Sequence, residues 1–207
     1  LIAGFSEPMQ GTISFDGRDY THVPLHKRNF GFVFQSYALF PHMTVFDNVA
    51  FGLKMRKLDK AVIQRDVMQM LKLVDLEGFE NRYPREMSGG QRQRVAICRA
   101  LILHPEVLLF DEVTAALDPE MVREVLDVML ELADSGQTML IVTHEMQFAR
   151  AIADQVILLE DGGIVERSDD AERFFTNPTT ERAKQFLHTF EFDRHRKSAE
   201  QSERSEQ

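Results

Sequence analysis

The sequence predicts an α/β fold with a parallel sheet, because short apolar runs alternate with longer segments of helical periodicity. Val107–Phe110 is an unbroken apolar run, and Thr138–Val142 is a second one, so we expect two strands that are buried on both faces. Asp118-Pro119 predicts the start of a helix between them, with an acidic cap followed by proline, and Ser135-Gly136 predicts its end. A strand, a helix and a second strand in this order indicate a parallel sheet, whose ligands lie beyond the carboxyl ends of the strands.

Other elements follow from local patterns of the same kind. Two helices are indicated by apolar residues at helical spacing, and the second has Ser88 as its N-cap. In chain order, the further predicted elements are a strand and hairpin turn at Ile13–Phe15 and Asp16-Gly17, a strand at Gly31–Phe34, helices at Asp59–Leu76, Ser88–Leu103 and Met146–Ala153, and a hairpin formed by Val156–Leu159 and Ile164–Glu166.

The composition indicates a globular protein and argues against some classes of partner. Hydrophobic residues make up 43% of the 207 residues, and the formal net charge is −9, which disfavours nucleic acid as a partner. Cys98 is the only cysteine, so no internal disulfide can form. No apolar stretch approaches the roughly 20 residues that a membrane-spanning helix needs.

Candidate chemistry lies at the ends of the two apolar strands. Asp111 and Glu112 follow the first strand, so one carboxylate can coordinate Mg²⁺ while the other faces an attacking water. His144 follows the second strand, within reach of a phosphate or of that water. Taken alone, these patterns are common, and solvated strand-end side chains would explain them as well.

Ser88-Gly89-Gly90-Gln91 opens a predicted helix and is followed by Arg92-Gln93-Arg94. Exposed N–H groups at the positive end of a helix dipole form an anion site, which suits a phosphate. A generic N-cap with a flexible glycine turn is the alternative that the local pattern leaves open.

The order of these residues resembles the motifs of ATP-binding-cassette (ABC) ATPases over residues 1–190. Ser88-Gly89-Gly90-Gln91 is similar to the signature motif, and Val107–Glu112 is similar to the Walker B strand. Three further matches are Gln35 for the Q-loop, Asp118 in Ala116-Leu117-Asp118 for the D-loop, and His144 for the switch histidine. The fold implied is that of a P-loop NTPase, with a parallel core sheet and a helical signature subdomain at about residues 47–100.

The resemblance also implies a role for each residue, with ATP and Mg²⁺ as the ligands. Glu112 would be the general base and His144 a second catalytic residue, while Asp111 and Gln35 would hold Mg²⁺. The residues implied to contact the nucleotide are Gln35, Ser88, Gly89, Gly90, Gln91 and Asp118.

One expected motif does not occur in these residues. The family's phosphate-binding loop, Gly-x-x-x-x-Gly-Lys-Ser/Thr, should precede Leu1–Phe5, which resembles the end of the helix that follows this loop. We therefore expect an incomplete P-loop NTPase fold in an N-terminally truncated chain that is inactive and unstable alone. We expect one ATPase domain over residues 1–190 and a disordered polar tail over 191–207.

The resemblance is to bacterial importers, and it implies the partners. The first third of the chain, especially His22-Val23-Pro24 and Tyr37-Ala38-Leu39-Phe40-Pro41, is similar to polyamine, ferric-ion and related importers. The part from Asp111 to the end is similar to polar amino acid importers, so we expect uptake of a small polar solute, most of all a polar amino acid, with a polyamine as the alternative. The implied partners are a second ATPase subunit in a homodimer or heterodimer, an integral membrane permease reached through the groove near Ser36–Val49, and indirectly a solute-binding protein. The expected location is peripheral, on the cytoplasmic face of the bacterial inner membrane.

Two alternatives compete with this interpretation. A non-catalytic partner would lend its signature motif to an intact subunit, but such a chain would not need to keep Glu112 and His144. A soluble ABC ATPase of DNA repair or translation is disfavoured by the acidic charge and by the lack of coiled-coil insertions.

Overall fold

The computed structural model describes residues 1–190 of the chain, which form two compact units. The first unit is Leu1–His144, and the second begins at Glu145. The tail predicted at 191–207 lies outside the described residues, and the assignment of 1–190 to one ATPase domain stays a prediction.

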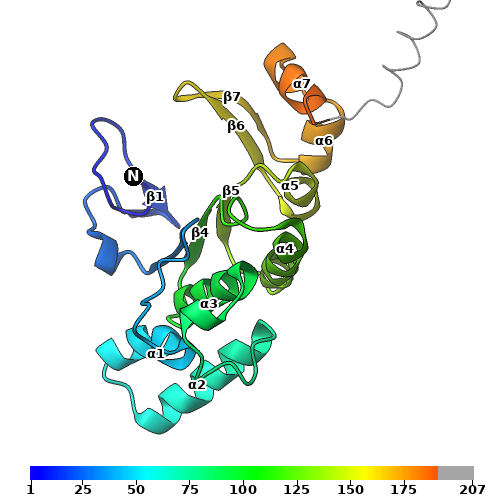
Figure 1. Cartoon of the computed structure of the whole chain (residues 1–207). Coiled ribbons are helices and arrows are strands. Elements are labelled where there is room, and N and C mark those ends of the chain that lie inside the picture. The colour runs from blue at the N-terminus through cyan, green and yellow to red at the C-terminus, as the bar shows by residue number, and fades with distance from the viewer. Residues whose placement is uncertain (191–207) are drawn as a thin grey trace, which may run out of the picture. The chain divides into compact units, whose positions relative to one another are not determined.

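The first unit is built on a parallel sheet, as the sequence predicts. Its three strands are β3 (Phe30–Val33), β4 (Val107–Asp111) and β5 (Met139–Val142), in the order β3-β4-β5 (Figure 1). Both pairings are parallel, with Val33 opposite Phe110 and Phe110 opposite Ile141. The three carboxyl ends therefore meet at one edge of the sheet, where the predicted site residues follow.

The prediction that both apolar runs are buried on both faces is correct for β4 and wrong for β5. The first four residues of β4 are buried, because this strand lies between two others. In β5, Leu140 is 42% exposed and Val142 is 51% exposed. An apolar run predicts double burial only for a central strand, and β5 has a neighbour on one side only within the described sheet.

Four helices accompany this sheet, and their starts follow from the residues that cap them. Thr44 and Asp59 each accept a backbone hydrogen bond at the start of a helix, from the N–H of Asp47 and of Ala61. The helices are α1 (Val45–Met55), α2 (Lys60–Leu73), α3 (Gly89–Leu101) and α4 (Pro119–Asp134), and the short 3₁₀ turns are η1 (Leu25–Lys27) and η2 (Pro84–Glu86). The predicted helices at 59–76, 88–103 and 118–134 are thus confirmed, whereas α1 had no sequence prediction of its own.

A small hairpin precedes the sheet. It consists of β1 (Ser14–Phe15) and β2 (Arg18–Asp19), as the sequence predicts. Asp16 and Gly17 form its turn in the left-handed region, with φ of 48° and 71°.

Arg28 is the largest polar side chain in the interior of this unit, and it is 2% exposed. Its Nε donates to the carbonyl of Val23 at 2.7 Å, and its Nη1 donates to that of Ile2 at 2.6 Å. Further donations go to the carbonyls of Leu1 and Thr21. Gly4 must be glycine here, because an added Cβ would lie 2.6 Å from Nε of Arg28.

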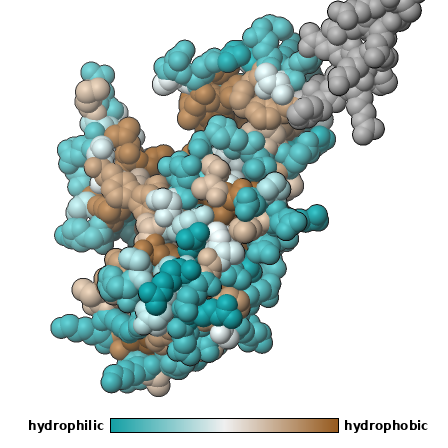
Figure 2. Space-filling view, viewed as in Figure 1, coloured by the Kyte–Doolittle hydropathy of each residue, from teal (hydrophilic) through white to brown (hydrophobic). Residues whose placement is uncertain are grey.

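The second unit combines a hairpin with three short helices. Its elements are α5 (Met146–Ile152), β6 (Val156–Glu160), β7 (Gly163–Ser168), α6 (Ala171–Thr176) and α7 (Glu181–His188), of which the sequence predicted the first three. Phe174, Ala183 and Leu187 form its buried core. Figure 2 shows apolar side chains over the β6–β7 hairpin, where Leu159 and Ile164 are exposed. None of the helices within residues 1–190 combines the length and apolar character needed to cross a bilayer.

Candidate functional site

The sheet edge at the ends of β4 and β5 positions the candidate catalytic pair. The N–H of Glu112 donates to the carbonyl of Val142 at 3.0 Å, which extends the β4–β5 pairing one residue beyond Asp111. Glu112 then leaves the strand in the left-handed region, with φ of 46°. Such a conformation is uncommon for a residue with a Cβ, so the surrounding structure must hold Glu112 in it.

Glu112 and His144 are in direct contact. Nε2 of His144 lies 2.7 Å from Oε1 of Glu112. The Glu112 side chain is 33% exposed and the His144 side chain is 71% exposed, so the pair faces solvent from one side. The structure thus brings together the two residues predicted to be catalytic.

Asp111 and Gln35 lie at the same edge, and their oxygens suit Mg²⁺. Asp111 ends β4, and Gln35 follows β3 by two residues, so both lie beyond strands that are direct neighbours. Among residues 1–190, Asp111 makes no ion pair, and no group of three or more His, Cys, Asp or Glu side chains could hold a metal. A carboxylate and an amide oxygen still fit Mg²⁺, because this ion keeps several waters and takes few protein ligands when it binds with phosphates. The metal role of both residues stays a prediction.

The Ser88-Gly89-Gly90-Gln91 segment forms the predicted start of α3. Ser88 Oγ accepts from the N–H of Gln91 at 3.2 Å, and Gln91 Oε1 accepts from the N–H of Ser88 at 3.0 Å. This capping box uses the Gln91 amide oxygen within the chain. The structure therefore gives Gln91 a helix-capping role, which the sequence reasoning did not anticipate, and its nucleotide contact stays a prediction.

The two glycines allow α4 to approach the start of α3. A Cβ on Gly90 would lie 3.0 Å from Cβ of Met121, and one on Gly89 would lie 2.9 Å from Cδ2 of Leu117. The Gly90 N–H also points to the sulfur of Met121, at 3.4 Å. The nucleotide contacts predicted for Ser88, Gly89 and Gly90 are not tested by this geometry.

Asp118 is at the expected position but does not act as expected. It is the N-cap residue of α4, yet its side chain accepts no capping hydrogen bond and is exposed. The prediction of an acidic side-chain cap is therefore wrong. Pro119 fits the first turn because no N–H is needed there, and this is enough to start the helix without a side-chain cap. The nucleotide contact predicted for Asp118 stays a prediction.

The sequence reasoning missed the residues that hold the segment after β3. Asn48, at 0% exposure, accepts from the N–H of Phe40 and donates to the carbonyls of Phe40, Met43 and Thr44. Gln93 and Arg99 of α3 donate to the carbonyls of Phe34, Tyr37 and Ala38. Gln93 and Arg99 are six residues apart, so they do not lie on one face of α3. No sequence pattern therefore marks them as a pair.

This geometry defines a class of protein: a parallel α/β sheet with an acid–histidine pair at its edge, and a capped glycine pair at the start of a neighbouring helix. The chain belongs to the ABC transporter family, whose model matches residues 1–115. Comparison with individual proteins narrows the relationship to ATP-binding subunits of bacterial importers.

The relatives include importers of two kinds of solute. The chain is 51% identical to the glutamate transport ATP-binding protein GluA of Corynebacterium efficiens, over 86% of this chain and 75% of that protein. It is 45% identical to the glutamate/aspartate import ATP-binding protein GltL of Escherichia coli, over 90% and 79%. It is 46% identical to the spermidine/putrescine import ATP-binding protein PotA of Mesoplasma florum, over 79% of this chain and 47% of that protein.

A solved structure has the same fold. It is a dimeric ATP-binding cassette in a post-hydrolysis state with ADP and Pi, and it matches with a TM-score of 0.70 and 31% identity, over 81% of this chain and 76% of that one. The predicted α/β ABC ATPase fold is thereby confirmed.

Proposed function

We propose that this chain is the ATP-hydrolysing subunit of an importer for a small polar solute, and that the solute is an acidic amino acid. The 2.7 Å contact between His144 and Glu112 at the end of β4 is the observation that carries the catalytic part of this proposal. A chain that only lent its signature motif to another subunit would not need this pair.

The pair is suited to activating water. Glu112 acts as general base toward a water that attacks the γ-phosphate of ATP. His144 donates from Nε2 to the Glu112 carboxylate, which fixes its orientation and leaves the other carboxylate oxygen for the water. Asp111 and Gln35 would hold Mg²⁺, which supplies positive charge to the phosphate oxygens when bound.

The start of α3 would serve the nucleotide of a second subunit. No hydrogen bond or ion pair within residues 1–190 joins Ser88–Gln91 to Glu112 or His144. We propose the family arrangement, in which the Ser88 end of one subunit faces the ATP that the other subunit holds. The related cassette with ADP and Pi is dimeric, which is consistent with this pairing.

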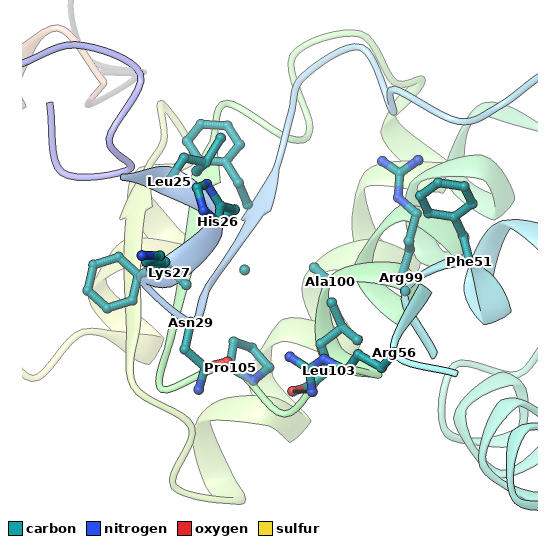
Figure 3. A pocket seen from close by; sticks show the side chains of 14 residues that line it. Leu25, His26, Lys27, Asn29, Phe51, Arg56, Arg99, Ala100, Leu103 and Pro105 are labelled. Carbon is teal, nitrogen blue, oxygen red and sulfur yellow. Dashed lines mark hydrogen bonds between the residues drawn. The ribbon is translucent and has the colours of Figure 1, made fainter. Parts of the chain in front are cut away.

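A cavity in the first unit suits contact with a permease. It has a volume of about 480 Å³ and is lined by η1 and β3 on one side and by α1 and α3 on the other (Figure 3). His26, Lys27, Arg56 and Arg99 bring basic groups to its lining. The groove was predicted near residues 36–49, and none of these residues lines the cavity. Phe40 nevertheless packs against Phe51, which is one of the lining residues. We propose that a permease segment with acidic and apolar side chains binds here, and that the chain lies on the cytoplasmic face of the membrane.

We base the proposed solute on the relatives, because an ATPase subunit of this family does not touch the solute. GluA and GltL are named for glutamate and aspartate, and the chain covers three quarters or more of each. It covers about half of PotA, which is named for polyamines. Acidic amino acids are therefore the solutes we propose.

Uptake by proteoliposomes tests the proposal. The full-length protein is reconstituted with its permease and solute-binding protein, and ATP-driven uptake of labelled glutamate and of labelled putrescine is compared. We expect glutamate uptake that is lost in Glu112→Gln. Uptake of putrescine alone would refute the solute, and unchanged ATP hydrolysis in Glu112→Gln would favour the non-catalytic role.

A further inference from the structure

The residue Gln35 lies in a tight turn whose backbone is unusual. The N–H of Tyr37 donates to the carbonyl of Phe34 at 3.3 Å and closes the turn around Gln35 and Ser36. Tyr37 and Ala38 then adopt left-handed conformations, with φ of 60° and 48°. Two consecutive residues with a Cβ in this region are unfavourable, so contacts elsewhere must hold them.

Two side chains of α3 provide these contacts. Nε2 of Gln93 donates at 3.3 Å to the Phe34 carbonyl, the same oxygen that closes the turn. Arg99 donates from Nη1 to the carbonyl of Ala38 at 2.6 Å, and from Nη2 to that of Tyr37 at 3.4 Å. The carbonyls on both sides of Gln35 are thus bonded to one helix.

The Gln93 side chain is fully buried where it makes this bond, and the Arg99 side chain is partly buried. Gln93 is 0% exposed, and its Oε1 has no hydrogen-bond partner in the structure. Burial lowers the pKa of Arg99 from its ordinary value, and among residues 1–190 no carboxylate pairs with it. Burying a polar group without a hydrogen-bond partner for each of its atoms is unfavourable. The hydrogen bonds to the turn offset part of this cost.

Tyr37 extends the connection to the start of α3. The Arg92 guanidinium lies over its ring, 4.9 Å from the centroid. A Cβ added to Gly89 would lie 3.1 Å from the Tyr37 hydroxyl. One side chain therefore reaches from the Gln35 turn to the glycine pair that follows Ser88.

We propose that Arg99 and Gln93 are positioning residues that hold the Gln35 turn on α3, so that Gln35 and the Ser88 end of α3 move as one piece. This inference rests on the proposed function, in which Gln35 meets Mg²⁺ at the chain's own nucleotide and Ser88 meets the nucleotide of the second subunit. The consequence is that a shift of Gln35 caused by nucleotide at one site also shifts the Ser88 end of α3 at the other site, through these hydrogen bonds.

The test compares Arg99→Met, which removes the donors but keeps the aliphatic stem, with Arg99→Lys and with the control Arg123→Met. Arg123 is an exposed arginine on α4. Two measurements are made on the full-length protein without permease. The first is hydrogen exchange of the peptide amides at 35–38 in the absence of nucleotide, and the second is ATP hydrolysis as a function of Mg²⁺ at fixed ATP.

We expect Arg99→Met to speed exchange at 35–38 about tenfold and to raise the half-saturating Mg²⁺ concentration by a similar factor, because loss of the groups that orient a metal ligand typically weakens metal binding about 10- to 100-fold. Arg99→Lys should lie between this variant and the wild type, since lysine keeps the charge but loses the fork that reaches two carbonyls. Arg123→Met should match the wild type in both measurements.

The outcomes separate the two proposals. Wild-type exchange in Arg99→Met would overturn the inference, whether or not the protein hydrolyses ATP. A lower kcat without a shift in the Mg²⁺ dependence would also overturn it, because loss of folded protein scales the rate alone. Absence of Mg²⁺-dependent hydrolysis in the wild type would overturn the proposed function, and the exchange measurement would still decide the inference.

Discussion

Glu166 of β7 offers a prediction that needs no nucleotide. Its carboxylate accepts three hydrogen bonds at 2.8 Å, from the N–H of Thr179, the N–H of Thr180 and the hydroxyl of Thr180. The residue is 7% exposed and ties the start of α7 to the hairpin. Burial alone would raise the pKa of this carboxyl, but the three donors outweigh burial and lower the pKa from its ordinary 4.5 to about 2.

Glu166→Gln replaces one acceptor oxygen with an NH₂ group. This NH₂ group would face a group of Thr179 or Thr180 that is itself a hydrogen-bond donor. We expect the free energy of unfolding at pH 7 to fall by about 2–3 kcal/mol, the usual scale for losing a hydrogen bond to a charged group in a buried place. Because the folded-state pKa is lowered, this stabilisation is complete above about pH 5 and is lost as the pH falls toward about 2. The difference between wild type and variant should therefore shrink on acidification.

Urea unfolding followed by circular dichroism between pH 3 and pH 7 measures that difference, and hydrogen exchange at Thr179 and Thr180 shows whether the loss is local. Glu160→Gln is the matched control, since Glu160 pairs with Arg182 at an exposed position of the same hairpin. Its unfolding should follow the wild type closely. A Glu166→Gln difference that stays constant from pH 3 to pH 7 would refute the argument that the carboxylate charge stabilises this contact.

Three further predictions concern the first unit. Glu112→Gln should retain binding of Mg²⁺-ATP and lower kcat about 10²–10⁴-fold, because a general base is lost, and equilibrium binding with single-turnover rates will check this. His144→Ala should leave the affinity for Mg²⁺-ATP similar and lower kcat by about 10²-fold, since the partner 2.7 Å from Glu112 is removed. A kcat equal to that of the wild type would show that the contact between His144 and Glu112 does not serve catalysis. Asn48→Ala should lower the free energy of unfolding by about 2–4 kcal/mol, because four backbone groups lose their hydrogen bonds to this side chain. Thermal or urea unfolding measures this change, and a change below the measurement error would show that water replaces the side chain.

Local patterns predicted the fold where the cause is itself local. The bounds of α4 agree with the predicted start at Asp118-Pro119 and end at Ser135, because the effects of proline and glycine on the backbone act within one turn. The exposure of Leu140 and Val142 could not be predicted in this way, since burial of a strand depends on how many neighbours it has. Periodicity reports the apolar residues but not the order of strands in a sheet.

The candidate site divides along the same line. Glu112 and His144 could be named as candidates because each follows an apolar strand, but their contact requires β4 and β5 to be neighbours in register. Gln93 and Arg99 gave no signal at all. Their side chains donate to backbone carbonyls about 60 positions earlier, and every residue type has the same carbonyl, so the sequence does not mark these acceptors.

The guanidinium of Arg28 has a consequence for how the first unit loses its structure. Four carbonyls from two stretches of backbone, at residues 1–2 and 21–23, converge on this one planar group without any strand pairing between the stretches. Lysine could not replace it, because an ammonium on a flexible stem does not match a fixed fan of acceptors. The two stretches are therefore held together by the hydrogen bonds of one side chain. We expect them to unfold together as one cooperative unit and not residue by residue.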